Sequence, residues 1–148
     1  MKPYIIGFYG KSNTGKTTII TDLIKRLTED DFKVATIKKS DKEISIDGPG
    51  KDTYRHAESG AKLTVLSSKS ETDFVVKKNI KTNEIIRIIS QIESYDFIFV
   101  EGAFDKYVPK IRIGDIDKRE NTVFDYDGDF GKLYNLVKSK GIKGENKK

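Results

Sequence analysis

The stretch "GFYGKSNTGKTT" (residues 7–18) decides how this chain folds. It follows an apolar run, and residues 10–17 fit the pattern G-x-x-x-x-G-K-[ST] at every fixed position. Gly10 and Gly15 let the backbone wrap tightly, so that successive N–H groups point into one concavity. The helix expected to begin near Lys16 directs its positive end at the same place. The stretch therefore predicts a loop that holds the phosphates of a nucleotide.

Two side chains in this loop have distinct chemical tasks. Lys16 supplies a mobile positive charge for the β- and γ-phosphates, and the Thr17 hydroxyl is a ligand for Mg²⁺. The alternative, a glycine-rich turn with a surface lysine, fits poorly because the pattern lies between a buried strand and an amphipathic helix. Lys11 is interpreted as a surface lysine, with a reach across to a partner's nucleotide as the alternative.

The rest of the chain alternates between strand and helix patterns. Short apolar runs without strict alternation, typical of parallel strands buried on both faces, occupy residues 4–9, 34–37 and 97–100. Further strands are expected at residues 63–66, 73–76 and 110–113. Three helical stripes are Ile20, Leu23, Ile24 and Leu27; Ile85, Ile88, Ile89 and Ile92; and Phe130, Leu133, Tyr134 and Val137, the last capped by Asp129. Together they predict a three-layer α/β/α P-loop NTPase fold with a mostly parallel sheet.

Composition narrows the kinds of site and partner. The chain has no cysteine and one histidine, His56, which excludes thiolate and multi-histidine metal sites. Residues 138–148 carry five lysines and one glutamate, and the rest of the chain is close to neutral at +1. We therefore expect one nucleotide-binding domain over residues 1–140, a flexible lysine-rich tail at 141–148, and no nucleic-acid partner. The lack of a long apolar run favours a cytoplasmic protein without membrane contact.

Acidic residues that complete the site are expected at the carboxyl ends of other strands. In "YDFIFVEG" (residues 95–102), Glu101 follows four apolar residues and is placed to orient the Mg²⁺ shell, with a solvated strand end as the alternative. Asp47 and Asp52 flank "GPGK" after the second strand, a region that often reaches the γ-phosphate and the metal in P-loop proteins. Asp52 is equally a candidate for the N-cap of the helix expected at residues 52–59.

Several stretches together resemble the molybdopterin-guanine dinucleotide biosynthesis protein B (MobB) family. These are "GKSNTGKTT", "TIKKS", "IDGPGKDTYRHAESGA" and "FIFVEG", in this order. The D-x-P-G-K-D-[ST] segment is the most specific of them. The resemblance covers about residues 3–114 and resumes at "TVFDYDGDFGKLYNLVKS".

The resemblance implies a GTP-binding, weakly hydrolysing homodimer that assists the guanylyltransferase attaching GMP to molybdopterin, with molybdopterin itself as a possible ligand. The family's GKD-[ST] loop falls on Asp52 and Thr53, and its VEG segment on Glu101 and Gly102. The phosphates and Mg²⁺ would be held by Asn13, Thr14, Gly15, Lys16, Thr17 and Thr18.

This chain departs from the family in two places. Lys39, Asp41 and Lys42 stand where the family commonly carries histidines, and no N-K-x-D motif is present to select guanine. Two other functions stay open. One is a nucleotide-loaded adapter without chemistry. The other is a small-molecule kinase, for which Arg112 and Arg119 are the available lid arginines.

Overall fold

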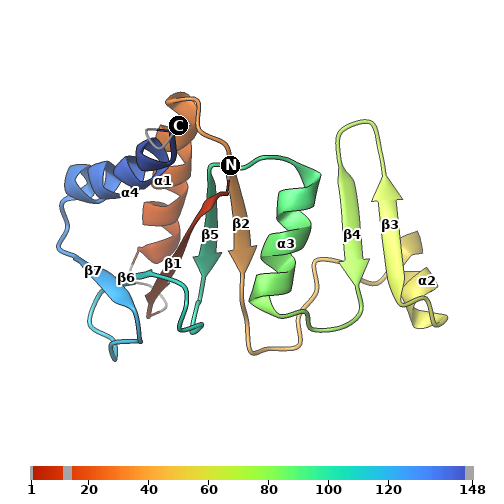
Figure 1. The fold of residues 1–148 in the computed structure, drawn as a ribbon. Coiled ribbons are helices and arrows are strands. Elements are labelled where there is room, and N and C mark those ends of the chain that lie inside the picture. Colours follow the sequence, from red (N-terminus) through yellow and green to blue (C-terminus); the bar gives the residue numbers. More distant parts are fainter. Residues whose placement is uncertain (1, 12–14, 146–148) are drawn as a thin grey trace. The chain divides into compact units, whose positions relative to one another are not determined.

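The computed structural model describes residues 2–11 and 15–145, with side chains to residue 141. The chain groups into two compact units: Ser40–Lys81, here the hairpin unit, and the remainder, here the sheet unit. The sheet unit contains a five-stranded sheet of order β2-β5-β1-β6-β7, in which every neighbouring pair is parallel (Figure 1). Its strands are β1 (Tyr4–Gly10), β2 (Val34–Lys38), β5 (Phe97–Glu101), β6 (Lys110–Ile113) and β7 (Thr122–Tyr126).

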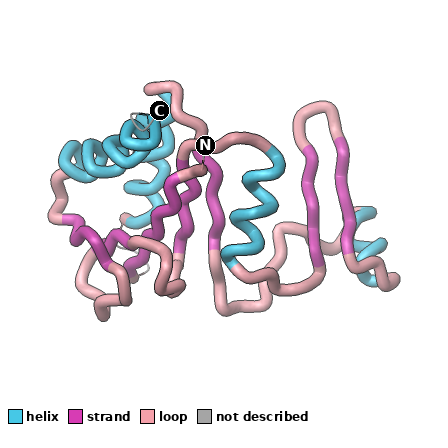
Figure 2. The backbone as a smooth tube through the Cα atoms, in the orientation of Figure 1, coloured by secondary structure: helices cyan, strands magenta, loops and turns pink. Residues whose placement is uncertain are grey.

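The predicted layers are confirmed by the packing on the two faces of this sheet. Against one face lie α1 (Lys16–Glu29) and α4 (Phe130–Glu145), which run close together (Figure 2). Against the other face lies α3 (Thr82–Ile92), through Ile85, Ile86 and Ile89. The predicted stripe of α3 was wrong for Ile88 and Ile92, which are exposed because Ile86 takes the inward position instead.

Strand register brings the ends of three strands to one place. In the central strand β1, Phe8 pairs with Glu101 of β5, and Gly10 pairs with Ile113 of β6. Because parallel strands end at the same edge of a sheet, the segments that follow β1, β5 and β6 are neighbours. This edge carries the motif that begins at Gly10.

The end of the chain differs from the sequence prediction in two respects. Strand β7 was not expected, since it alternates between half-buried and exposed residues as an edge strand does. Helix α4 begins after Asp129, whose side chain accepts the Lys132 N–H as predicted, and continues to Glu145, into the segment expected to be a flexible tail. Gly141 allows this, because a Cβ there would lie 2.7 Å from the Phe97 ring.

The hairpin unit is built from α2 (Asp52–Glu58) and an antiparallel pair, β3 (Leu63–Ser67) and β4 (Thr72–Val76). The two strands predicted here therefore form a sheet of their own. The single domain over residues 1–140 stays a prediction. Within the described ranges, no helix combines the length and apolar character that a bilayer crossing requires.

Candidate functional site

The glycine-rich loop starts where β1 ends, at Gly10, and leads into α1 at Lys16. A Cβ on Gly10 would lie 2.4 Å from the Ile113 carbonyl oxygen, so the adjacent strand β6 leaves room only for glycine. Gly15 has φ = 79°, a left-handed conformation that glycine adopts without strain, and forms the N-cap of α1. Asn13 and Thr14, which are expected to hold phosphate, lie outside the described residues.

The first turn of α1 is suited to an anion. It contains no acidic residue, and within the described residues no side chain caps its free N–H groups. The positive end of the helix dipole is therefore not neutralised from within the helix. Thr17 and Thr18 are exposed on this turn.

The structure brings Lys16 and Glu101 together, as expected from their places at the ends of neighbouring elements. The Lys16 Nζ lies 3.8 Å from Glu101 Oε1 and donates a hydrogen bond to the Gly10 carbonyl at 3.3 Å. Both side chains are about one-fifth exposed, so the pair is partly shielded yet open to a ligand. An anion bound at the loop would meet an ammonium group and a carboxylate side by side.

The turn after Glu101 is fixed to the end of β2. Gly102 has φ = 81°, and a Cβ there would lie 2.9 Å from the Lys39 carbonyl oxygen. The Lys39 N–H donates to the Glu101 carbonyl at 2.9 Å. Glu101 therefore leaves the sheet in a defined direction.

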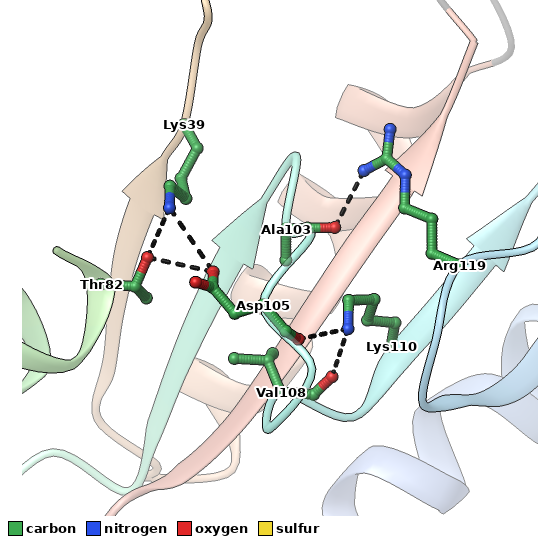
Figure 3. A network of polar contacts seen from close by, with 7 residues as sticks. All are labelled: Lys39, Thr82, Ala103, Asp105, Val108, Lys110 and Arg119. Carbon is green, nitrogen blue, oxygen red and sulfur yellow. Dashed lines mark hydrogen bonds and ion pairs between the residues drawn. The ribbon is translucent and has the colours of Figure 1, made fainter.

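Three cations hold residues 102–108, here the 102–108 loop, as Figure 3 shows. Lys39 Nζ contacts Thr82 Oγ1 at 2.6 Å and Asp105 Oδ2 at 3.5 Å, and the Thr82 hydroxyl donates to the same carboxylate at 3.1 Å. The guanidinium of Arg119 donates to the Ala103 carbonyl at 2.9 Å. Lys110 donates hydrogen bonds to the Asp105 and Val108 carbonyls of the loop.

Lys110 is fully buried in the structure. Its Nζ donates to the carbonyls of Asp105, Val108 and Glu120. Burial away from water lowers the pKa of this ammonium group. Sequence reasoning missed the part that Lys39, Lys110 and Asp105 take in holding this loop, because nothing in the local sequence distinguishes a lysine that binds a loop from a solvated one.

The two arginines considered for a kinase lid are both engaged in the architecture. Arg112 donates to the Ile116 carbonyl at 2.8 Å and lies 3.5 Å from Asp125 Oδ1. The guanidinium carbon of Arg119 lies 3.5 Å from the centroid of the Phe104 ring. Both side chains thus support loops, which weighs against a role as mobile lid residues.

A pocket of about 410 Å³ lies beside the start of the glycine-rich loop, at the end of β6. Lys11 and Arg112 contribute to its wall, together with residues 115–118. The pocket is therefore next to the loop for which phosphate binding is predicted.

The acidic residues of the 40–81 segment have local roles. Asp47 Oδ1 accepts hydrogen bonds from the Gly48 N–H and from Thr53 Oγ1, so it organises its own loop. Asp52 is the first helical residue of α2, whereas Lys51 is the N-cap, and the capping role considered for Asp52 was wrong. The Mg²⁺ role of Asp52, which belongs to the hairpin unit, stays a prediction.

Comparison with known proteins agrees with this arrangement. The sequence profile of "Molybdopterin guanine dinucleotide synthesis protein B" (MobB) matches residues 5–130. The chain belongs to the MobB family. Crystallographic Bacillus subtilis MobB superposes with a TM-score of 0.73 over 93% of this chain and 97% of that chain, at 19% identity, which supports a common fold.

Two curated relatives carry the family's name as adapters. A putative molybdopterin-guanine dinucleotide biosynthesis adapter protein of Methanocaldococcus jannaschii is 36% identical over 66% of this chain and 40% of its own length. The corresponding adapter protein of Haemophilus influenzae is 29% identical over 72% of this chain and 61% of its own length. The match thus spans less than two thirds of either relative. Both names place these relatives in molybdopterin-guanine dinucleotide biosynthesis.

Proposed function

We propose that this MobB-family protein is a GTP-binding, weakly hydrolysing accessory protein that assists the guanylyltransferase of molybdenum cofactor biosynthesis. The observation that carries the proposal is the meeting of Lys16 with Glu101 at the positive end of α1. An ammonium group, a carboxylate and uncapped helix N–H groups at one strand edge form the arrangement that a nucleotide triphosphate and its metal need. The Lys16, Glu101 and Asp52 side chains are the proposed catalytic groups.

Mg²⁺ fits the residues at this edge. No cluster of three or more acidic, histidine or cysteine side chains suited to a metal exists among the described residues. Mg²⁺ commonly binds through one or two carboxylates together with substrate phosphates, so a ready-made protein cage is not required. Thr17 and Glu101 are the proposed ligands at this edge, and Asp52 of the hairpin unit is proposed as a third from the resemblance to the family. The ion, when bound, would neutralise charge on the β- and γ-phosphates.

A preference for guanine is supported by the pocket beside Lys11. Asp115 and Asp117 belong to its lining. Carboxylate oxygens accept hydrogen bonds from N1–H and from the 2-amino group of guanine, which adenine cannot offer in the same way. This lining supports GTP over ATP as the proposed nucleotide.

Partner and assembly are proposed from the relatives and from the hairpin. The relatives' names as adapters support docking on a guanylyltransferase of the MobA type, and binding of molybdopterin itself belongs to the same proposal. A homodimer is supported by the side chains of Leu63, Val65, Phe74 and Val76, which form one exposed apolar face of the hairpin. We place the protein in the cytoplasm, where the nucleotide and the partner enzyme are available.

Calorimetric titration with GTP and ATP, with and without Mg²⁺, tests the nucleotide assignment. Lys16→Ala is expected to abolish measurable GTP binding, a loss of at least about 100-fold, because a charge-assisted contact to phosphate disappears. Lys25→Ala on the exposed side of α1 is the matched control and should bind like the parent. Undiminished GTP affinity in the Lys16 variant would show that the phosphates bind elsewhere.

A second candidate function is that of an adapter that binds a nucleotide without hydrolysing it. The contacts of the Lys39 side chain favour this function. The resemblance to the family implies histidine near this position, whereas the Lys39 ammonium group here is bound to Thr82 and Asp105. Phosphate release from GTP, measured with and without the guanylyltransferase, separates the two. Release stimulated by the partner supports the hydrolysing protein, and stable bound GTP supports the adapter.

A further inference from the structure

The hairpin unit contains a second pocket, of about 250 Å³, within residues 46–75. Its floor is the face of the β3–β4 pair opposite to the exposed apolar face. Thr64 and Leu66 of β3 line it, together with Asp73 and Val75 of β4, which pair with them across the strands. The loop before α2 contributes Ile46 and Asp47.

Two polar atoms in this pocket are buried without a partner. Thr64 is only 5% exposed, and its Oγ1 has no hydrogen-bond partner within the described residues. Asp47 Oδ2 is also buried without a hydrogen-bond partner within the described residues, although Oδ1 of the same carboxylate accepts two hydrogen bonds. Buried polar groups in proteins are almost always paired, so these two atoms indicate that the pocket receives a hydrogen-bonding ligand.

The charge of the pocket indicates which kind of ligand. Asp47, Glu71 and Asp73 contribute three carboxylates, against one ammonium group from Lys51, whose Nζ lies 3.5 Å from the Ile46 carbonyl. A hydrogen bond with the neighbouring Asp73, followed by the charge repulsion between the two carboxylates, raises the pKa of Glu71. The pocket therefore suits a positively charged donor.

Two alternatives to an organic cation of this kind are less suitable. The described residues hold no group of three acidic, histidine or cysteine side chains arranged for a metal ion. A primary ammonium group is strongly hydrated, whereas Ile46, Leu66 and Val75 make part of the wall aliphatic. A guanidinium group is flat and weakly hydrated, and its five N–H donors can reach carboxylates on two sides at once.

We propose that the Asp47–Thr64 pocket binds a guanidinium group, carried either by a free small molecule or by an arginine side chain of a partner protein. One edge of the group donates to Asp47 Oδ2 and Thr64 Oγ1, and the opposite edge faces the carboxylates of the hairpin. All the residues that line this pocket belong to the hairpin unit.

The test uses the full chain and three probes followed by NMR titration: Nα-acetyl-arginine amide, its citrulline counterpart, and a tripeptide with arginine between two glycines. The arginine probe is expected to bind saturably, and the neutral citrulline probe at least about tenfold more weakly, since hydrogen bonds between charged groups are the stronger ones. Tighter binding of the tripeptide assigns the site to a protein partner, and equal binding assigns it to a small molecule.

Thr64→Val and Thr72→Val form a matched pair of variants. Thr64 points into the pocket, whereas Thr72 lies on the other face of the same hairpin. Thr64→Val is expected to weaken arginine binding about tenfold without loss of folding, because its hydroxyl has no partner within the described protein to lose. Thr72→Val should bind like the parent. Equal binding of arginine and citrulline, no saturable binding, or an unaffected Thr64 variant would overturn the proposal.

Discussion

Lys110 shows how a charged side chain can be tolerated in the interior of this protein. Its ammonium group is surrounded by the carbonyls of Asp105, Val108 and Glu120, so all three of its N–H donors are used. Desolvation lowers its pKa, while the three acceptors keep the charged form in place. The residue thereby fixes the backbone that follows Glu101.

Replacing this lysine should cost much of the protein's stability. Lys110→Met keeps most of the volume but leaves three carbonyls without donors, and we expect a loss of about 2–4 kcal/mol in the free energy of unfolding. Urea denaturation measures this value. Lys106→Met is the control, because the Lys106 side chain is 84% exposed and should change stability by less than about 0.5 kcal/mol. Equal stability of the two variants would contradict the structural role of Lys110.

Glu101 is the residue at which the proposed metal dependence can be measured. Glu101→Gln keeps the shape of the side chain and removes its charge, so the gain in GTP affinity on adding Mg²⁺ should fall about tenfold. Calorimetry with and without Mg²⁺ gives this ratio. Glu93→Gln, which removes only a surface ion pair with Lys33, is the control. If the gain in GTP affinity on adding Mg²⁺ is unchanged in the Glu101 variant, Glu101 is a solvated carboxylate at the end of its strand and not part of the metal site.

The residues of the site were predictable to different degrees. Lys16 and Glu101 could be paired from the sequence, because a motif and a strand end both point to the same sheet edge. Lys39, Asp105 and Lys110 could not, since their roles arise from which carbonyls and carboxylates the fold places within reach. The role of Asp47 near the γ-phosphate stays a prediction, and the hydrogen bonds of its Oδ1 to its own loop could not be predicted from the sequence.

Helix α4 is joined to α1 by a polar contact as well as by apolar packing. The Tyr134 hydroxyl donates to Asp30 Oδ2, Lys138 Nζ lies 3.2 Å from the same oxygen, and the Arg26 guanidinium lies over the Tyr134 ring at 4.3 Å. Burial, together with the hydrogen bond to Asp30, raises the pKa of Tyr134 to about 12. The contact therefore requires a protonated phenol.

This shift predicts how stability changes in alkali. The folded protein keeps the Tyr134 proton up to pH 12, whereas the unfolded chain loses it near pH 10, so the folded state binds more protons between these values. Stability then falls as pH rises through this window, by about 1 kcal/mol between pH 9 and pH 11 from this residue alone. Urea unfolding of the parent and of Tyr134→Phe checks it. The fall in the free energy of unfolding between pH 9 and pH 11 should be smaller in the variant by that amount. If the free energies of parent and variant fall in parallel with pH, Tyr134 does not contribute.

Elements buried on both faces were easier to predict than those at edges. Strands β1, β2 and β5 are apolar runs, and the structure places them at the predicted positions with one more residue at the carboxyl end of each. Strand β7 was missed because Thr122 and Asp125 interrupt its apolar residues, and because the apolar Val123 is exposed where an alternating strand would have a polar residue. The separate sheet of β3 and β4 was missed because the local sequence indicates that a segment is a strand but does not indicate which strand it pairs with.

The proposed homodimer can be tested through the apolar face of the hairpin. Phe74 is 60% exposed and lies opposite Val65 on this face. Phe74→Asp should weaken self-association at least about 100-fold, because a charge would have to be buried in an apolar interface. Sedimentation or light scattering at several concentrations gives the mass, and Ser70→Asp in the turn of the hairpin is the control. A monomeric parent, or a Phe74 variant as dimeric as the parent, would refute the assembly.

The close approach of Ile113 to Gly10 affects how mutational scanning data on this protein should be interpreted. A library screened for folding alone would already reject every residue other than glycine at position 10, because the β6 backbone occupies the space a methyl group needs. Intolerance at this site would therefore not distinguish a selected nucleotide binder from a descendant that has lost its ligand. The fold does not require the Lys16 and Thr17 side chains in this way. Whether substitutions are tolerated at these two positions therefore indicates whether nucleotide binding is still under selection.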